Sequence, residues 1–266
     1  MAEKLERLHE KHPDMGYRRL NDKLRHDEDI QVNDKRILRI CRKKQELRNR
    51  GLHHNHKLVM KLMHQMGLSS KVRMKKYRSY KGEVGKIAPN LLERNFYAEK
   101  PNQKWVTDVT EFKYGNTLDS VHKVYLSAIL DLCDRRPVAY VIGDSNNNAL
   151  VFETFDKAVK ANPGAHPIFH SDRGYQYTSR RFHQKLEEAG MVQSMSRVAH
   201  CTDNGVMEGF WGILKREMYY GKKFESREEL EKAITEYIDY YTNDRPQRGL
   251  GVLTPMEFHE KQRLAA

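Results

Sequence analysis

The sequence predicts an α/β domain with a central mixed sheet, preceded by a smaller basic all-α region. Two observations support this division. After residue 102, three strand-like segments follow one another and then alternate with helices, which is typical of an α/β domain. Before residue 100, the pattern is that of short helices rich in basic residues. With 266 residues, 38% of them hydrophobic, the chain can bury a sizeable core in one large domain or two modest ones.

The excess positive charge lies in the first 100 residues, which hold 26 Lys and Arg against 13 Asp and Glu; the rest of the chain holds 22 against 23. Residues 35–86 contain 17 basic residues and only two acidic ones, Glu46 and Glu83. Such a concentration of positive charge favours binding to a polyanion, because binding releases the polyanion's counterions. A solvated basic surface or a disordered tail is the alternative, which we rank second because the region also shows helical periodicity.

Neither targeting nor disulfide signals are present. No segment approaches the roughly 18 to 20 apolar residues needed to cross a bilayer, and the charged start MAEKLERLHEKHPD lacks a signal-peptide core. The three cysteines, Cys41, Cys133 and Cys201, are too scattered for a disulfide framework or a zinc site. We therefore expect a cytoplasmic protein without membrane association.

The basic region predicts helices over 16–27, 32–47 and 54–67, with Asn33 as a helix cap and Gly67 as a helix end. Compact helices with one basic face suit helix-turn-helix docking on DNA, although RNA or a partner protein fits the same pattern. The DNA-contact candidates here are Arg36, Arg39, Arg42 and Lys43. Residues 69–101 have the composition of a basic linker, in which Lys75 and Lys76 either follow a phosphate backbone or belong to a solvated tether.

The second region predicts strands at 103–115, 123–135, 137–144, 166–172 and 191–196. Helices are expected at 147–162, 178–190 and 203–220, the last one long and opened by Asp203 or Asn204 as its cap. The active crevice of such a domain should lie at strand ends.

Three acidic residues stand out in this region. Asp108 lies among apolar and β-branched neighbours in WVTDVTEF, where a carboxylate is costly unless paired or cation-bound; exposure on an open strand face is equally plausible. Asp172 follows PIFHS at a strand exit, where ligands bind in α/β sheets, although a Ser-Asp-Arg-Gly turn also explains it locally. Glu208 shares a helix face with Trp211 and Lys215, which by itself is better explained as a surface stripe.

Taken together, the three acids could meet over one edge of the sheet. Three carboxylates in one crevice repel one another unless divalent cations are present, and hard oxygen ligands favour Mg²⁺ or Mn²⁺. Two such ions can support the chemistry of a phosphodiester. A basic DNA-docking region joined to a carboxylate site therefore points to phosphodiester chemistry on nucleic acid.

The order WVTDVTEF, HSDRGYQYTS, SMSRVAHCTDNGVMEGFWGILKREM, with 35 residues between Asp172 and Glu208, resembles the DDE catalytic core of the IS3 family of bacterial insertion-sequence transposases, which are related to retroviral integrases. The resemblance extends to YIDYYTNDRPQRGLGVLTPMEF, and back to GYRRLNDKL and VNDKRILRI, so it covers nearly the whole chain. Gln247 stands where the closing motif usually has histidine, Tyr175 replaces a common serine, and Gly205 and Gly209 replace other small residues.

The resemblance implies an RNase H-like mixed five-stranded sheet in which Asp108, Asp172 and Glu208 bind two Mg²⁺ ions, with Mn²⁺ as a substitute. It also implies that Lys215 lies near DNA. From their positions after Asp172, we expect Arg173 to lie in the loop that lets the site approach DNA, and Thr178 and Ser179 to cap the next helix. We expect four parts: a helix-turn-helix-like region at 1–68, a linker at 69–101, a catalytic core at 102–222 and a helical extension at 223–266.

The implied function is DNA transposition, in which water cuts at the element's end and the freed 3′-hydroxyl attacks a second phosphate. The partners implied are double-stranded DNA with terminal repeats, target DNA, at least a second copy of the chain on DNA, and an upstream reading-frame product, since no leucine zipper precedes MAEKLERL. A bacterial cytoplasmic protein, nucleoid-associated when on DNA, is expected. The alternatives are a DNA-binding accessory or regulatory subunit that is inactive without the upstream segment and, less well supported, an RNase H-like nuclease without joining activity.

Overall fold

The computed structural model describes residues 2–12, 15–28, 30, 87–115, 121–198 and 201–264. The chain separates into two compact units, Met1–Ser79 and Tyr80–Ala266. The helices predicted at 32–47 and 54–67 lie outside the described residues. The same holds for six of the predicted DNA contacts, Arg36, Arg39, Arg42, Lys43, Lys75 and Lys76.

The described part of the first unit contains two helices in contact, α1 (Ala2–Lys11) and α2 (Tyr17–Glu28). α2 confirms the helix predicted at 16–27. Leu20 and Leu24 are buried and lie one turn apart on α2, so they face the same side of the helix. Leu5 of α1 and Met15 of the connection are buried as well. Basic side chains in the last turn of α2 suit the negative end of its dipole.

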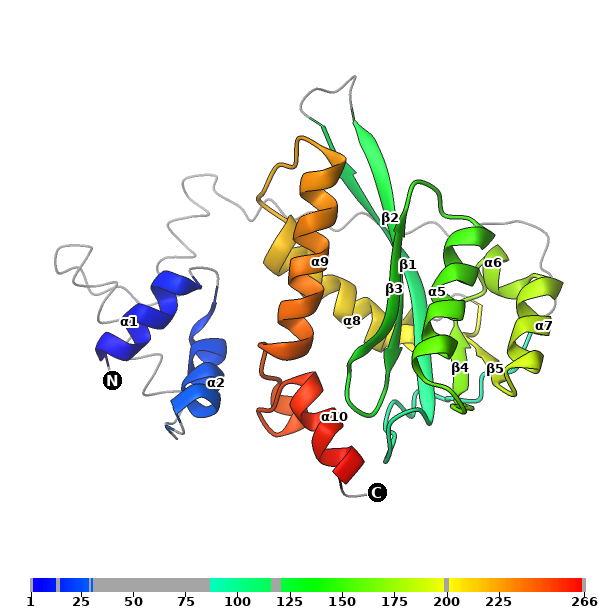
Figure 1. Cartoon of the computed structure of the whole chain (residues 1–266), viewed down its shortest axis with the longest axis horizontal. Helices are drawn as coiled ribbons and strands as arrows, with labels where there is room; N and C mark the ends of the chain where they lie inside the picture. The colour runs from blue at the N-terminus through cyan, green and yellow to red at the C-terminus, as the bar shows by residue number, and fades with distance from the viewer. Residues whose placement is uncertain are drawn as a thin grey trace. The chain divides into compact units, whose positions relative to one another are not determined.

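The second unit is built on a five-stranded sheet with the order β3-β2-β1-β4-β5. Its strands are β1 (Lys104–Tyr114), β2 (His122–Asp131), β3 (Pro137–Gly143), β4 (Ile168–Ser171) and β5 (Val192–Met195). β1, β2 and β3 form an antiparallel meander, β4 runs parallel to β1, and β5 runs parallel to β4 (Figure 1). The mixed sheet expected from the sequence is therefore confirmed, with the long strand β1 at its centre.

Helices cover both faces of this sheet (Figure 1). α5 (Asn148–Ala161), α6 (Tyr175–Thr178) and α7 (Arg180–Glu188) lie on one side. α8 (Gly205–Leu214), the π-helical turn η3 (Lys215–Tyr219) and α9 (Arg227–Asn243) lie on the other, and α10 (Pro255–Leu264) packs against α9. Two short 3-10 turns, η2 (Cys201–Asn204) and η4 (Arg248–Leu250), precede α8 and α10.

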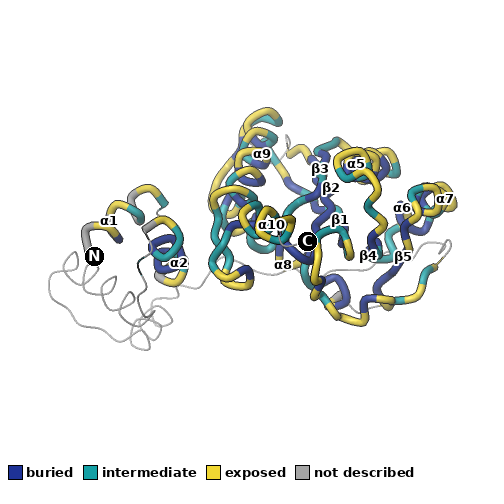
Figure 2. The backbone as a smooth tube through the Cα atoms, turned by 60° about the horizontal axis from the view of Figure 1, so that its bottom comes forward, coloured by how far each residue is buried: buried dark blue, intermediate teal, exposed yellow. Residues whose placement is uncertain are grey.

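Successive side chains of β1 point to opposite faces of the sheet and contribute to two separate cores. Buried segments lie on either side of the sheet (Figure 2). Trp105 belongs to the core with α5 and α7, in which the rings of Phe155, Phe169 and Phe182 contact one another. Its neighbour Val106 belongs to the opposite core, which holds the apolar faces of α8 and α9. Because both faces are filled, β1 is held rigidly at the point where it carries Asp108.

Local signals explain where the helices begin. The side chains of Asn147, Ser179 and Ser226 accept hydrogen bonds from the backbone N–H groups of Leu150, Phe182 and Glu229, so each caps its helix. Ser179 thus confirms the predicted cap, whereas Thr178 ends α6 and bonds back to the carbonyls of Gly174 and Tyr175.

The helix predicted over 203–220 is present without a break, but its geometry changes along its length. It starts as the 3-10 turn η2, becomes α8, and widens into η3, where the N–H of Tyr220 donates to the Lys215 carbonyl five residues back at 2.7 Å. The extra residue in this turn lets Met218 be buried while the Tyr219 hydroxyl bonds to the backbone of Lys113 on β1. No helix in the described part of the chain is long and apolar enough to cross a membrane.

Candidate active site

Asp108 lies in the middle of β1, opposite Ala128 of β2, with a half-buried side chain. Its Oδ2 accepts a hydrogen bond of 3.0 Å from Nε1 of Trp211 on α8. Burial and, next, the negative charge of Asp172 raise the pKa of Asp108 to about 7, and the charge of Glu208 acts in the same direction. The N–H groups of Val109 and Trp211 oppose this rise only partly. Asp108 is therefore a carboxylate held in an unfavourable setting, not an exposed strand residue.

Asp172 follows β4 directly, as predicted, and is also half-buried. β1 and β4 are parallel, and their last register pair is Val106 with His170. Asp108 and Asp172 each stand two residues beyond that pair, so the two carboxylates occur at matching positions of neighbouring strands. Burial raises the pKa of Asp172, while the N–H of Gly174, 2.9 Å from its Oδ1, opposes the rise.

Gly174 allows the turn after Asp172 to stay this tight. A Cβ at this position would lie 3.0 Å from Asp172 Oδ1 and 2.9 Å from Gln176 Oε1. The next residue, Tyr175, is exposed, and its hydroxyl donates to the carbonyl of Asn146 in the loop before α5. Tyr175 thus connects α6 to that loop.

Glu208 lies in the first turn of α8 and is exposed. Trp211, three residues later, is only 6% exposed, so the interpretation of this face as a surface stripe is wrong for Trp211. The helix instead uses its tryptophan to reach Asp108, which brings Glu208 to the side of the sheet where the aspartates lie. Asn204 fixes the start of α8 on the same strand, because its Nδ2 donates to the Thr107 carbonyl at 3.0 Å.

Lys215 begins η3 and is half-buried, with its Nζ 5.1 Å from the centre of the Phe112 ring. Burial lowers the pKa of Lys215, and the charges of Glu111 and Asp108 oppose this shift. The ammonium of Lys215 is thus close enough to Asp108 and Glu111 for their charges to act on it. Arg173 is placed next to Asp172, and its Nε donates to the Ser196 carbonyl at 2.8 Å.

The donor chemistry of the site suits a hard divalent cation. Two half-buried carboxylates have raised pKa values, the charge of Glu208 acts on one of them, and oxygen ligands of this kind favour Mg²⁺ or Mn²⁺. Among the described residues, however, no three His, Cys, Asp or Glu side chains are gathered into a ready-made metal cluster. The exposed position of Glu208 is consistent with this, because its carboxylate is not drawn in beside the two aspartates.

Sequence reasoning missed two buried residues beside the site. Asp203, expected as a possible helix cap, is fully buried and forms ion pairs with Arg94 and Arg197. The other cap candidate, Asn204, occupies the cap position of α8 but its side chain makes no capping hydrogen bond. His170 is also fully buried, between the hydroxyls of Ser194 and Ser196, and burial lowers its pKa to about 4. The only signal available was the polar motif HSD at a strand end.

Family models match three segments of the sequence. An HTH-like domain matches residues 1–45, and integrase core domains match residues 98–201 and 208–264. Asp108 and Asp172 fall in the first integrase core match, and Glu208 is the first residue of the second.

Three curated relatives align with this chain over three quarters or more of their length. The chain is 47% identical over 204 residues to a transposase-like protein of Haemophilus influenzae, covering 77% of this chain and 92% of the relative. It is 44% identical over 216 residues to the InsK protein of insertion sequence element IS150 from Escherichia coli K12, covering 81% and 75%. The transposase of IS904 from Lactococcus lactis is 36% identical over 217 residues, covering 80% and 84%.

Solved structures with a similar arrangement are more distant. The HTLV-2 integrase catalytic core domain in complex with magnesium aligns at 18% identity with a TM-score of 0.45, over 60% of this chain and 97% of that one. The catalytic core domain of BIV integrase aligns at 16% identity with a TM-score of 0.47, over 62% and 97%.

Proposed function

The chain belongs to the IS3-like family of insertion-sequence transposases and acts in DNA transposition; from this premise we propose that it cuts and joins DNA strands at Asp108, Asp172 and Glu208. Its core has the RNase H-like fold, and its N-terminal part is a DNA-binding HTH-like domain. The chemistry proposed is Mg²⁺-dependent hydrolysis followed by transesterification of phosphodiesters.

The observation that carries the proposal is the matched position of Asp108 and Asp172 beyond a shared register pair. Keeping two carboxylates together with raised pKa values costs folding free energy unless a ligand compensates for it. A divalent cation is the ligand that would do so, and Glu208, on the helix anchored to Asp108 through Trp211, is the third donor available to it.

We propose that these three residues hold two Mg²⁺ ions, with Mn²⁺ as a functional substitute. When bound, such ions activate the attacking oxygen and stabilise the leaving oxygen of an in-line displacement. The chain's own residues orient this site: the Trp211 N–H holds the Asp108 carboxylate, and the Gly174 N–H holds that of Asp172. Lys215, partly buried beside Asp108, provides a positive charge for the DNA strand.

The basic stretch 35–86 is the proposed binding region for the element's terminal repeats. It has 17 basic and two acidic residues, so the dissociation constant should rise steeply with salt. Because two element ends must be brought together, at least two copies of the chain are expected on DNA. A cytoplasmic location, at the nucleoid when bound to DNA, is part of the same proposal.

A strand-cleavage assay tests the chemistry. The full chain is incubated with Mg²⁺ and a duplex carrying the terminal repeats, beside Asp172→Asn and a surface control, Asp156→Asn, at an exposed ion pair on α5. We expect cleaved and joined products from the wild type and the control, and none from Asp172→Asn. Duplex binding without any covalent product from the wild type would instead support the accessory-subunit alternative.

A further inference from the structure

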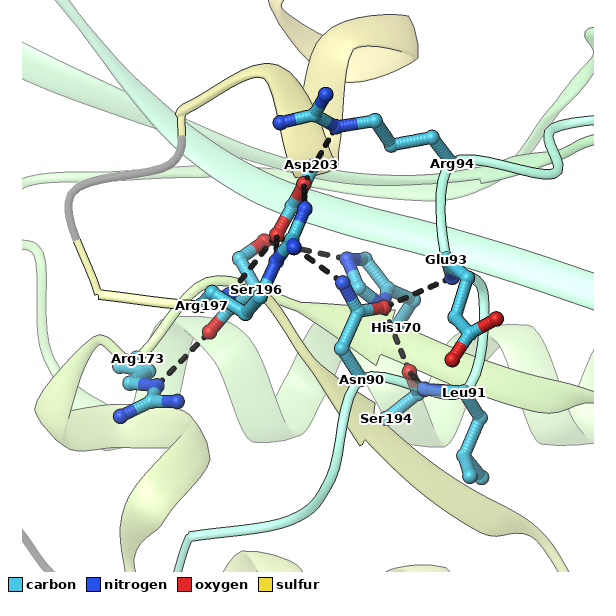
Figure 3. A network of polar contacts seen from close by, with 10 residues as sticks. All are labelled: Asn90, Leu91, Glu93, Arg94, His170, Arg173, Ser194, Ser196, Arg197 and Asp203. Carbon is cyan, nitrogen blue, oxygen red and sulfur yellow. Dashed lines mark hydrogen bonds and ion pairs between the residues drawn. The ribbon is translucent and has the colours of Figure 1, made fainter.

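Asp203 is the centre of a polar network at the edge of the sheet (Figure 3). Its buried carboxylate accepts hydrogen bonds from Nε of Arg94 at 2.8 Å, from Nε and a terminal nitrogen of Arg197 at 2.8 and 2.9 Å, and from Asn90 Nδ2 at 3.0 Å. The backbone N–H of Arg197 adds a fifth bond at 3.1 Å. Together these donors hold the pKa of Asp203 far below its usual range.

The two arginines are not buried with it. The side chains of Arg94 and Arg197 are 47% and 50% exposed, whereas that of Asp203 is 0% exposed. Arg94 uses only its Nε for the carboxylate, and its guanidinium makes no other hydrogen bond or ion pair within the described residues. Arg197 likewise keeps one terminal nitrogen without a contact among the described residues. Each guanidinium is thus fixed along one edge and open along another.

The network lies at the same edge of the sheet as the proposed catalytic carboxylates. β5 runs parallel to β4 with Met195 opposite Ser171, and the Ser196 N–H donates to the Ser171 carbonyl at 2.9 Å. Arg197 therefore leaves β5 beside the turn that follows Asp172. Asp203 in turn precedes Glu208 by five residues, at the start of α8.

The network itself carries a net positive charge. One carboxylate is shared by two guanidinium groups, and Arg173, bonded to the Ser196 carbonyl, adds a third cation with a free outer edge among the described residues. Besides Asp203, Glu93 is a second acidic residue whose charge acts on Arg197. A single bidentate arginine would already neutralise Asp203, and the second one comes from a segment more than 100 residues away. With Glu93 counted, the three arginines exceed the two carboxylates by one positive charge.

We propose that Arg94 and Arg197, oriented by Asp203, bind backbone phosphates of the DNA strand that enters the catalytic site. A planar guanidinium presents paired N–H groups that match phosphate oxygens, and anchoring it beforehand reduces the conformational entropy lost on binding. The assignment rests on the proposed function of the neighbouring carboxylates, since it is their substrate whose phosphates are bound.

A phosphate-replacement experiment tests this directly. Binding of the full chain to a terminal-repeat duplex is measured by fluorescence anisotropy without divalent cation, for the wild type, Arg94→Gln, Arg197→Gln and a control, Arg181→Gln, at an exposed arginine on α7. Neutral methylphosphonates replace single phosphates around the cleaved bond. At one or two positions, we expect the replacement to weaken DNA binding by the wild type several-fold. At these positions it should not weaken binding by Arg94→Gln any further. Binding by Arg181→Gln should be weakened as much as that of the wild type.

The salt dependence gives a second readout, because the slope of log K against log salt should fall by about 0.9 for each phosphate that the variant no longer neutralises. Arg94→Lys tests whether a loss of binding comes from misfolding. Its ammonium can keep the ion pair with Asp203, so its Tm should equal that of the wild type. The methylphosphonate that weakens wild-type binding should nevertheless have no further effect on this variant. Losses that add at every phosphate, or slopes unchanged in all arginine variants, would overturn the assignment. Asp172→Asn separates the two proposals, because it should abolish cleavage while leaving binding, slope and coupling intact.

Discussion

Asp108 and Asp172 stand two residues beyond the same register pair, Val106 with His170, on neighbouring parallel strands. The sheet therefore largely sets their mutual position, because Asp172 is the first residue after β4. Because both are half-buried and of like charge, the carboxylate form is disfavoured, and the pKa of Asp108 rises to about 7. At neutral pH the two carboxylates therefore lower the stability of the fold, and the proposed cation would offset this cost in free energy.

Divalent cation should therefore stabilise the folded protein. In Mg²⁺ or Mn²⁺ at about 100 times its dissociation constant, we expect the free energy of unfolding to rise by about 2.7 kcal/mol, measured as a shift in Tm. Asp108→Asn and Asp172→Asn should lose this shift. In EDTA at pH 8, Asp108→Asn should melt above the wild type, because the amide removes the repulsion between the carboxylates. A wild-type Tm that neither Mg²⁺ nor Mn²⁺ changes would contradict the assignment.

Trp211→Phe should weaken cation binding in a pH-dependent way. The change keeps the aromatic ring in the core but removes the N–H that stabilises the Asp108 carboxylate, so the pKa of Asp108 rises further. A hydrogen bond to a charged group contributes about 1.5–3 kcal/mol, so apparent Mn²⁺ affinity at pH 7 should fall roughly tenfold or more and recover towards pH 9. Phe210→Leu, in the same core, should lower Tm without moving this pH profile. An unshifted profile in Trp211→Phe would show that the bond has no electrostatic role.

Most of the second unit could be predicted from the sequence, because its strands carry strong apolar patterns. Each predicted strand from 103–115 to 191–196 contains an observed one, or nearly all of it, and Asp172 was correctly placed at a strand exit. The division into 1–68, 69–101, 102–222 and 223–266 stays a prediction, as do the roles assigned to Asp108, Asp172 and Glu208. The register that matches Asp108 with Asp172 depends on how two strands about 60 residues apart pair, which periodicity does not encode.

The sequence did not predict the burial of Trp211 or the ion-pair partners of Asp203. Trp211 looked like part of a surface stripe because helical spacing shows which residues share a face but not which face is buried. Asp203 looked like a helix cap, since aspartate before a helix most often is one. Its real partners, Arg94 and Arg197, come from segments that meet only in the folded sheet.

Asp203 should make stability sensitive to acid. Its folded pKa is lowered, so its contribution is present above its unfolded pKa of about 4 and is lost as the pH falls below that value. Asp203→Asn should cost about 1.5–3 kcal/mol at pH 7, with the gap to the wild type narrowing below pH 4, measured by urea unfolding. Asp156→Asn, which breaks an exposed pair with Lys185, should cost at most about 1 kcal/mol. A gap that stays constant between pH 7 and pH 3 would mean that the ion pairs do not stabilise the fold.

Lys215→Met should separate DNA contact from stability. Burial already disfavours the ammonium, and a methionine of similar length can keep the contact with the Phe112 ring, so Tm should change little. Loss of the charge removes an interaction of about 1.5–3 kcal/mol with the DNA strand, so strand cleavage should fall roughly 10-fold to 150-fold. Lys223→Met, at an exposed position between η3 and α9, is the matched control and should retain full cleavage. Equal losses in both variants would point to a general effect of net charge, and unimpaired cleavage by Lys215→Met would remove Lys215 from the site.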